Sequence, residues 1–168
     1  MVKIPVVKKD AFDVTVLFPK MKVAVRIQDE QVTEIRYLPL SSPDIAPTTP
    51  LAERAARQIE AYREDPDTRF DFPVRIEGSA FQRSVWQAMC AIPRGKTRTY
   101  GDLARELGGE ARVVGQACGD NRLPIVIPCH RVVAADGIGG FAHATGGYLL
   151  EVKRWLLLHE AGEFALEP

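Results

Sequence analysis

The chain has 168 residues, enough for one medium-sized domain or two small ones with a hydrophobic core between them. Its 22 basic and 22 acidic side chains give a formal net charge of zero, so no global field attracts it to nucleic acid and any DNA contact must be local. The odd number of cysteines without CxxC spacing excludes a disulfide framework and a cysteine-rich zinc site, and no apolar stretch reaches membrane-spanning length. A signal peptide is not recognisable, so we expect a protein of the reducing cytoplasm.

The N-terminal part of the chain predicts a small sheet covered by a helix. Residues 12–18, 22–28 and 32–38 are β-branched runs separated by short polar turns, which indicates an antiparallel meander. After a proline-rich loop, apolar residues recur at helical spacing, so one helix is expected to cover one face of the sheet. These apolar residues are Leu51, Ala55, Ile59 and Tyr62.

An acidic stretch with two prolines then suits a linker, and the composition changes near Gly78. Ser79 and Gln82 have the spacing of a capping box, which predicts the start of a helix that Pro93 ends. Its apolar stripe is Phe81, Val85, Met89 and Ile92.

Two short helices are expected next, joined by a tight glycine turn. Thr99 could cap the first helix, with Asp102 at its third position, and Gly108 and Gly109 end it. The second helix follows directly in "EARVVGQACGDN". This layout is that of a helix-turn-helix, although paired short helices are also common in ordinary helical cores.

The second of these helices has an unusually bare face, formed by Ala111, Gly115 and Cys118 or Gly119. A glycine within a helix costs roughly 0.5–1 kcal/mol relative to alanine, so something must approach this backbone closely. Either another helix packs there or the face enters a DNA groove. Residues 94–131 contain seven Lys or Arg against four Asp or Glu, which favours DNA.

The most informative stretch is "LPIVIPCHRVV", a β-rich apolar run that ends in Cys129, His130 and Arg131. A cysteine followed by two basic groups is a setting in which a thiolate becomes stable and nucleophilic, whereas most cysteines are simply small core residues. A last helix is predicted over residues 148–160, with Lys153 and Arg154 facing outward. Its inward residues are Leu149, Val152, Trp155 and Leu156.

Four motifs taken together resemble the O6-alkylguanine-DNA alkyltransferases: "IPCHRVV", "TRTYGDLA", "ARVVGQACGDN" and "KRWLLLHE". The resemblance covers residues 79–162. It implies an α+β fold with a ribonuclease-H-like N-terminal domain, an antiparallel sheet with a helix, over residues 1–78. It also implies a C-terminal helical domain with a winged helix-turn-helix over residues 79–168.

The resemblance also implies an activity. The family moves an alkyl group from O6 of guanine, or less readily from O4 of thymine, in double-stranded DNA to its own cysteine, once per protein molecule. The protein is then expected to be a monomer that needs no cofactor and no metal. Residues 1–78 contain neither Cys nor His, so the zinc ligands of some relatives have no counterpart.

Four residues match the family's reaction machinery. Cys129 is the alkyl acceptor, and His130 acts on it through a bound water. Glu160 polarises His130, while the competing candidate His159 is interpreted as structural. Tyr100 is expected to stabilise the departing guanine by donating a hydrogen bond.

Further residues match the family's DNA-binding parts. Arg112 is expected to fill the stack from which the target base is flipped, while Ala111 and Gly115 let the helix enter the minor groove. The phosphate contacts predicted here are Lys96, Arg98 and Arg122. Arg122 replaces the proline of many relatives.

The remaining expectations concern the hinge and the pocket. Asn121 matches a hinge residue whose amide bonds the turns around the cysteine. The backbone carbonyls of Cys129 and Val132 are expected to accept from the guanine amine. The loop over residues 137–148 is longer than in compact relatives, and Phe141 and Ala142 are placed in the pocket wall.

Three other classes of protein remain as alternatives. A non-catalytic relative binds alkylated bases but lacks the cysteine of the motif. A transcriptional regulator would use the same helix pair without a nucleophile. Family members fused to regulators carry an added cysteine-rich zinc module, which this sequence lacks. A thiol hydrolase would share the Cys–His pair but would turn over repeatedly.

Overall fold

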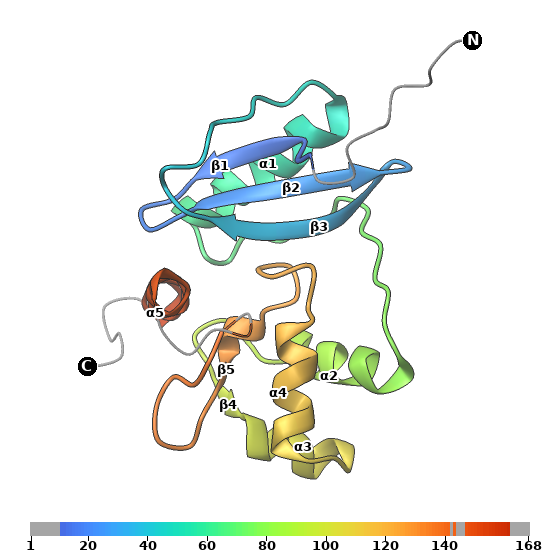
Figure 1. The fold of residues 1–168 in the computed structure, drawn as a ribbon, viewed down its shortest axis with the longest axis vertical. Coiled ribbons are helices and arrows are strands. Elements are labelled where there is room, and N and C mark those ends of the chain that lie inside the picture. Colours follow the sequence, from blue (N-terminus) through green and yellow to red (C-terminus); the bar gives the residue numbers. More distant parts are fainter. Residues whose placement is uncertain (1–10, 142, 144–146, 162–168) are drawn as a thin grey trace.

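The computed structural model describes residues 11–141, 143 and 147–161, and it has a mixed α/β fold (Figure 1). An antiparallel sheet and helix α1 lie at one end, and shorter helices lie at the other. The elements in chain order are β1 (Val14–Leu17), β2 (Lys22–Gln28), β3 (Gln31–Leu38), α1 (Pro50–Glu64), α2 (Ala80–Cys90), β4 (Arg98–Thr99), α3 (Tyr100–Leu107), α4 (Ala111–Gly119), the 3-10 helix η1 (Cys129–Arg131), β5 (Val132–Val133) and α5 (Tyr148–Ala161).

The predicted meander is confirmed, because the strands pair antiparallel in the order β1-β2-β3. The turn between β2 and β3 is formed by Asp29 and Glu30, which both have positive φ angles, 52° and 60°. Two consecutive residues in this region are typical of the tight hairpin turn that matches the twist of the strands. The turn places Ile27 opposite Val32, and a bulge between Arg26 and Ile27 then shifts the register so that Val23 lies opposite Tyr37.

Helix α1 begins at Pro50 after the N-cap Thr49, whose side chain accepts a hydrogen bond from the backbone N–H of Ala52. The helix lies on one face of the sheet (Figure 1). Its four predicted apolar residues are all buried, which confirms the helical spacing. They are Leu51, Ala55, Ile59 and Tyr62.

The helices of the C-terminal part begin where the sequence indicates. Both capping boxes are present, Ser79 with Gln82 at the start of α2 and Thr99 with Asp102 at the start of α3. Gly108 ends α3 in the left-handed conformation, with φ 74°. Helices α3 and α4 then pack against each other as the predicted helix pair.

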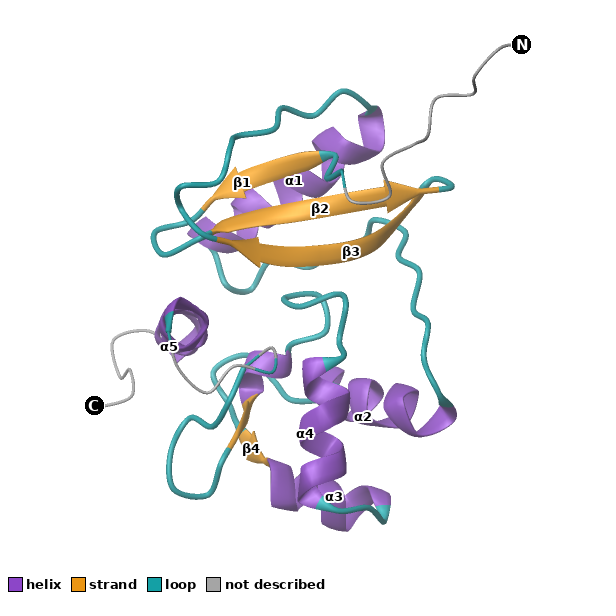
Figure 2. Cartoon of the chain, in the orientation of Figure 1, coloured by secondary structure: helices purple, strands orange, loops and turns teal. Residues whose placement is uncertain are grey.

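The apolar run before the cysteine is not a strand. Residues 122–127 form turns and bends, and the chain between α4 and α5 is mostly loop (Figure 2). Ile125 has a positive φ of 74°, which a β-strand does not allow. The β-rich composition therefore does not produce a strand here, although Leu123, Ile125 and Ile127 are buried and Val126 is partly buried.

Helix α5 corrects a second expectation. Lys153 was predicted to face outward, yet its exposed fraction is 0%, while its neighbour Arg154 is exposed.

Among the described residues, no helix is both long and apolar enough to cross a lipid bilayer.

The N-terminal part (residues 11–78) and the C-terminal part (residues 79–161) contact each other at several points. The backbone N–H of Ile35 in β3 donates to the carbonyl of Arg122, at 2.8 Å. At the other end of the junction the ring of Phe18 packs edge-on against Trp155 of α5, with centroids 5.6 Å apart. The sheet therefore lies directly over the segment that carries the cysteine motif.

Replacing Ile59 by alanine tests the packing of α1. Ile59 is fully buried on the face of α1 that packs on the sheet, so Ile59→Ala should lower the free energy of unfolding by about 2–5 kcal/mol. The neighbouring exposed position supplies the control, since Glu60→Ala should change it by no more than about 0.5 kcal/mol. Urea denaturation measures both, and equal effects would contradict the packing described.

Candidate active site

Cys129 begins the 3-10 helix η1 and is largely buried, with 7% of its surface exposed. It lines a cavity of about 570 Å³ between the edge of the sheet and the C-terminal part of the chain. Other residues that line this cavity are Tyr37, Cys118, Asn121, Phe141 and Tyr148. The sequence motif therefore places a thiol at an internal surface that a small group could reach.

The environment of Cys129 favours the neutral thiol in the free protein. Burial raises the pKa of Cys129, while the Asn121 side chain and the positive charge of Lys153 act in the opposite direction. Burial also raises the pKa of Cys118, to about 12. A reaction at Cys129 therefore needs a group that removes the thiol proton.

His130 is a suitable proton acceptor. Burial lowers the pKa of its imidazole, against the effect of Glu160, so the ring is neutral at pH 7. Its Nε2 lies 2.9 Å from Oε1 of Glu160. Both ring nitrogens are buried and neither meets the geometry of a hydrogen bond among the described residues, so Nε2 faces Oε1 as a close polar contact and Nδ1 is available to accept a proton.

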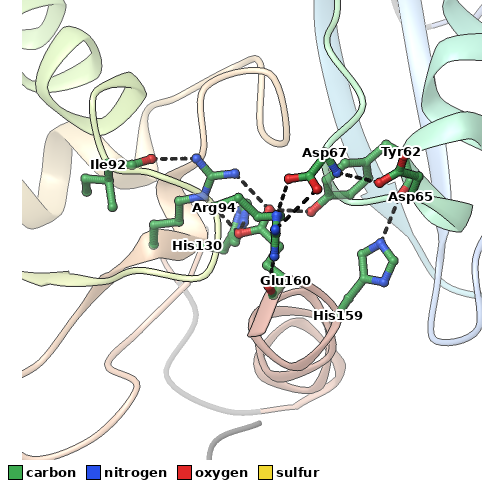
Figure 3. A network of polar contacts seen from close by, with 9 residues as sticks. Tyr62, Asp65, Asp67, Ile92, Arg94, His130, His159 and Glu160 are labelled. Atoms are coloured by element: carbon green, nitrogen blue, oxygen red, sulfur yellow. Dashed lines mark hydrogen bonds and ion pairs between the residues drawn. The ribbon is translucent and has the colours of Figure 1, made fainter. Parts of the chain in front are cut away.

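Glu160, near the end of α5, is 1% exposed. Burial alone would raise the pKa of its carboxyl group, but the contacts from His130 and Arg131 outweigh burial and hold the pKa well below its usual range. The carboxylate is therefore ionised beside His130. The neighbouring His159 instead has its Nε2 2.7 Å from the backbone carbonyl of Tyr62 (Figure 3). This contact agrees with the structural role predicted for His159.

Arg131 does not have the role that its position in the sequence suggested. Its guanidinium forms two hydrogen bonds with Glu160, at 2.8 and 3.0 Å, and one with the carbonyl of Ile92, at 2.6 Å. It therefore neutralises the buried carboxylate. The expectation that both basic groups after the cysteine stabilise its thiolate was wrong for this residue.

Lys153 is the residue at this site that sequence reasoning missed. Its Nζ donates to the carbonyls of Val132 (2.7 Å) and Gly140 (2.9 Å) and lies 3.4 Å from the hydroxyl of Tyr100. Burial lowers the pKa of Lys153 to about 8, so it is still mostly charged at neutral pH. Its place between the inward residues Val152 and Leu156 gave no signal, because a lysine there usually extends to solvent.

Tyr100 lies at the start of α3, and its hydroxyl donates to the carbonyl of Gly140 at 3.2 Å. Burial raises the pKa of Tyr100, so the hydroxyl keeps its proton and remains a donor. Lys153 and Tyr100 thus share one carbonyl in the loop after β5. This contact ties the phenol to the segment that bears Cys129.

Asn121 makes contacts of the kind expected of a hinge residue. Its side-chain amide donates to the carbonyl of Ile127 at 2.9 Å, and its side-chain oxygen accepts from the backbone N–H of Leu123 at 2.9 Å. Both bonds close the turns that lead from α4 to Cys129. The next residue, Arg122, is held at the sheet edge, with its guanidinium 3.3 Å from Glu34.

The predicted pocket residues are placed as follows. Phe141 is buried and lines the cavity together with Cys129. The carbonyl of Val132 already accepts a hydrogen bond from Lys153, which leaves one lone pair for a ligand. Ala142 lies outside the described residues.

The predicted DNA-binding face of α4 is narrower than expected. Ala111 is exposed, and beside Gly115 the nearest atom to an added Cβ would be a ring carbon of Tyr100 at 4.0 Å. Cys118 instead faces the core, with its sulfur 3.6 Å from that of Met89, and Gly119 packs against the ring of His143. The open face is therefore formed by Ala111 and Gly115 alone.

The basic residues predicted to contact DNA differ in their ionic contacts. Arg112 at the start of α4 is exposed, and its closest ionic contact is a loose one with Glu110 at 3.9 Å. Arg98 pairs with Glu106 at 2.7 Å. Lys96 is exposed in the loop before β4, against the end of α5.

Comparison with known proteins agrees with this geometry. Residues 80–162 match the family described as "6-O-methylguanine DNA methyltransferase, DNA binding domain". The chain is 44% identical over 106 residues to the methylated-DNA–protein-cysteine methyltransferase of Methanosarcina barkeri, which covers 61% of this chain and 64% of that protein. The chain spans between 30% and 64% of the length of the first curated relatives that it matches.

Solved structures agree over a longer stretch. The O6-methylguanine methyltransferase of Mycobacterium tuberculosis superposes with a TM-score of 0.72 at 33% identity, covering 88% of this chain and 90% of that one. A crystal structure of Mycobacterium tuberculosis OGT in complex with DNA gives a TM-score of 0.69 at 32% identity, covering 88% and 92%. Fold and site thus agree with those of the DNA methyltransferases to which the chain is similar. The chain belongs to the 6-O-methylguanine DNA methyltransferase family.

Removing the charge of Lys153 should make Cys129 harder to ionise. Lys153→Met takes away a positive charge that lowers the pKa of the thiol, so that pKa should rise further. The pH dependence of carboxamidomethylation of Cys129, followed by mass spectrometry, measures the shift. Arg154→Met, an exposed neighbour on α5, is the control and should leave it in place. An unchanged midpoint in Lys153→Met would contradict the electrostatic role.

Proposed function

We propose that the chain repairs DNA by moving the alkyl group of O6-alkylguanine, or less readily of O4-alkylthymine, to Cys129. The observation that carries the proposal is the buried thiol of Cys129, next in the chain to a buried His130 whose Nε2 lies 2.9 Å from the ionised Glu160. A nucleophile next to an oriented base is the arrangement that alkyl transfer to sulfur requires. The family membership supports the same reaction.

The proposed reaction balances as a direct displacement. The bond from the Cys129 sulfur to the alkyl carbon forms while the bond from that carbon to O6 breaks, and guanine keeps the electron pair. The thiol proton leaves towards Nδ1 of His130 through the bound water that the family resemblance implies, and guanine takes up one proton, with Tyr100 as the donor that stabilises its developing charge. Overall, the cysteine loses a proton and the guanine gains one.

The product is a thioether, which guanine does not attack readily. The protein is therefore expected to act once per molecule and not to turn over. Cys129 and Val132 offer backbone carbonyls to the guanine amine, and Phe141 supports the proposed pocket wall because it lines the same cavity.

We infer that double-stranded DNA is bound through its minor groove by α4. Ala111 and Gly115 leave the backbone of this helix open, and the exposed Arg112 at its start can fill the space left by a flipped base. Asn121 then couples α4 to the turns around Cys129. Lys96, Arg98 and Arg122 are the proposed phosphate contacts.

Finer features of the architecture are also inferred from the family. The sheet with α1, within residues 1–78, is taken as a ribonuclease-H-like domain, and residues 79–168 as a domain with a winged helix-turn-helix. We infer a monomer that needs neither cofactor nor metal. The three free cysteines suit the reducing cytoplasm.

Cys129→Ser should abolish alkyl transfer and leave DNA binding largely intact, because a neutral hydroxyl is a poor nucleophile and the DNA contacts lie elsewhere. Mass spectrometry of the intact protein after incubation with O6-methylguanine DNA should show one added methyl group in the unaltered protein and none in the variant. Cys90→Ser and Cys118→Ser are the controls and should still gain one group. Methylation of Cys129→Ser, or repeated turnover, would overturn the proposed reaction.

Arg112→Ala should impair repair of duplex DNA by roughly tenfold or more, because extruding a paired base costs a few kcal/mol that the inserted side chain offsets. Reaction with free O6-benzylguanine should change little, because the free base has no stack to leave. Arg105→Ala removes an arginine that is equally exposed but lies on α3, and serves as the charge-matched control. Equal losses on both substrates would remove the proposed role of Arg112.

A further inference from the structure

A tyrosine from the N-terminal part of the chain reaches the buried carboxylate of the site (Figure 3). Tyr62 lies in the last turn of α1 and is 2% exposed. Its hydroxyl donates to Oε2 of Glu160 at 2.7 Å, across 98 positions of the sequence. Tyr62 lies outside residues 80–162, the part of the chain that the family match covers.

The two oxygens of Glu160 have different partners. Oε1 accepts from Nε of Arg131 at 2.8 Å and lies 2.9 Å from Nε2 of His130. Oε2 accepts from Arg131 at 3.0 Å and from Tyr62. Because the last torsion of a glutamate side chain is broad and soft, the plane of the carboxylate is fixed only by such donors. Tyr62 holds Oε2 on the side away from His130, which leaves Oε1 facing the imidazole.

We propose that Tyr62 is a positioning residue for alkyl transfer, which acts through Glu160 on the tautomer of His130. The proposal rests on the proposed function. A well-placed Oε1 keeps the imidazole proton on Nε2, so that Nδ1 carries the lone pair that accepts the thiol proton of Cys129. The N-terminal part of the chain thus contributes a side chain to the proton path.

Tyr62 is itself rigidly held, which this role requires. Its carbonyl lies 2.7 Å from Nε2 of His159, and the two rings meet edge to face with centroids 5.3 Å apart. Burial, together with the negative charge of Glu160, raises the pKa of Tyr62 far above its usual range. The hydroxyl therefore stays a donor throughout the working range of pH and does not titrate with the site.

The other titratable and charged groups around this carboxylate come from η1, from the loop after α2 and from β3, whose Tyr37 has its pKa raised by burial and, to a lesser extent, by Cys129, Tyr62 and Glu160. His130 and Arg131 of η1 contact its oxygens directly. Arg94, in the loop after α2, donates to the backbone carbonyl of Glu160 at 2.7 Å and pairs with Asp67. Asp67 therefore lies at the same junction without touching the carboxylate, which makes it a matched control position.

The first test compares Tyr62→Phe with Asp67→Asn in the full-length chain. Tyr62→Phe removes one oxygen atom, and the rate of transfer from O6-methylguanine DNA should fall about tenfold, the effect of losing one hydrogen bond to a charged group. The midpoint at which the rate rises with pH should fall, because a displaced carboxylate supports a protonated His130 less well and the neutral imidazole then persists to lower pH. Asp67→Asn should keep the original rate and midpoint.

Two outcomes would overturn the proposal. One is an unchanged rate and midpoint in Tyr62→Phe. The other is a lower rate with an unchanged midpoint, matched by an equal loss of rate in Asp67→Asn, because that result would show only a weakened junction. Thermal denaturation of both variants records how far the junction itself is loosened.

The second test observes His130 directly and needs no DNA. The chain has three histidines, so long-range nitrogen–proton NMR spectra can be assigned with one His→Gln variant each for His143 and His159. In the unaltered protein the imidazole of His130 should be neutral with its proton on Nε2. In Tyr62→Phe the two tautomers should mix, and the pKa of His130 should fall further. An unchanged tautomer, or a higher pKa, would mean that Tyr62 only screens Glu160 and does not position it.

A double-mutant cycle distinguishes this proposal from the proposed function. If Tyr62 acts through the carboxylate, Tyr62→Phe should have no further effect on the tautomer or the pH midpoint in a Glu160→Gln background. Additive effects would contradict the path through Glu160. If the unaltered protein transfers no alkyl group at all, the proposed function fails, while the NMR cycle still decides the role of Tyr62.

Discussion

The buried carboxylate of Glu160 is the interaction on which the rest of the site depends. An ionised group with 1% exposure is tolerable only if donors replace the water that it has lost. Tyr62 supplies one from α1 and Arg131 supplies two from η1, while Nε2 of His130 lies 2.9 Å from Oε1. Three elements that are far apart in the sequence are therefore held around one charge. Loss of any of these donors would leave part of that charge without compensation.

The same arrangement explains how the thiol can be both buried and reactive. Burial raises the pKa of Cys129 and lowers that of His130, so both partners are neutral in the free protein. A neutral thiol reacts slowly with oxidants and stray electrophiles, because the thiolate is the nucleophile. When the proton moves, the new charges lie beside Glu160 and Lys153, which carry the opposite signs. The site thus stabilises charge separation mainly where the proposed reaction needs it.

Much of the fold follows from local sequence signals. The features that could not be predicted depend on partners far away in the chain. The meander, the spacing of α1 and both capping boxes were predictable because each depends on residues close together in the chain. The parallel pairing of β4 with β5 was not, since strands of two residues show no periodicity. Buried Lys153 was also missed, because its partners are backbone carbonyls that no side-chain pattern reveals. For the site, the motif located Cys129 and His130, while the directions of Arg131 and Tyr62 required the tertiary structure.

The candidate site therefore includes residues that lie outside the part of the sequence matched by the family. The family match begins at residue 80, yet the hydroxyl that completes the shell of Glu160 comes from residue 62. The edge strand β3 likewise holds the segment that follows Asn121, because the backbone N–H of Ile35 donates to the carbonyl of Arg122. A sequence comparison detects positions that share residue types, whereas a buried charge depends on whichever donors the fold brings to it. The small sheet with α1 is accordingly part of the candidate site, because Tyr62 contacts the carboxylate that faces His130 and Ile35 bonds the segment that leads to Cys129.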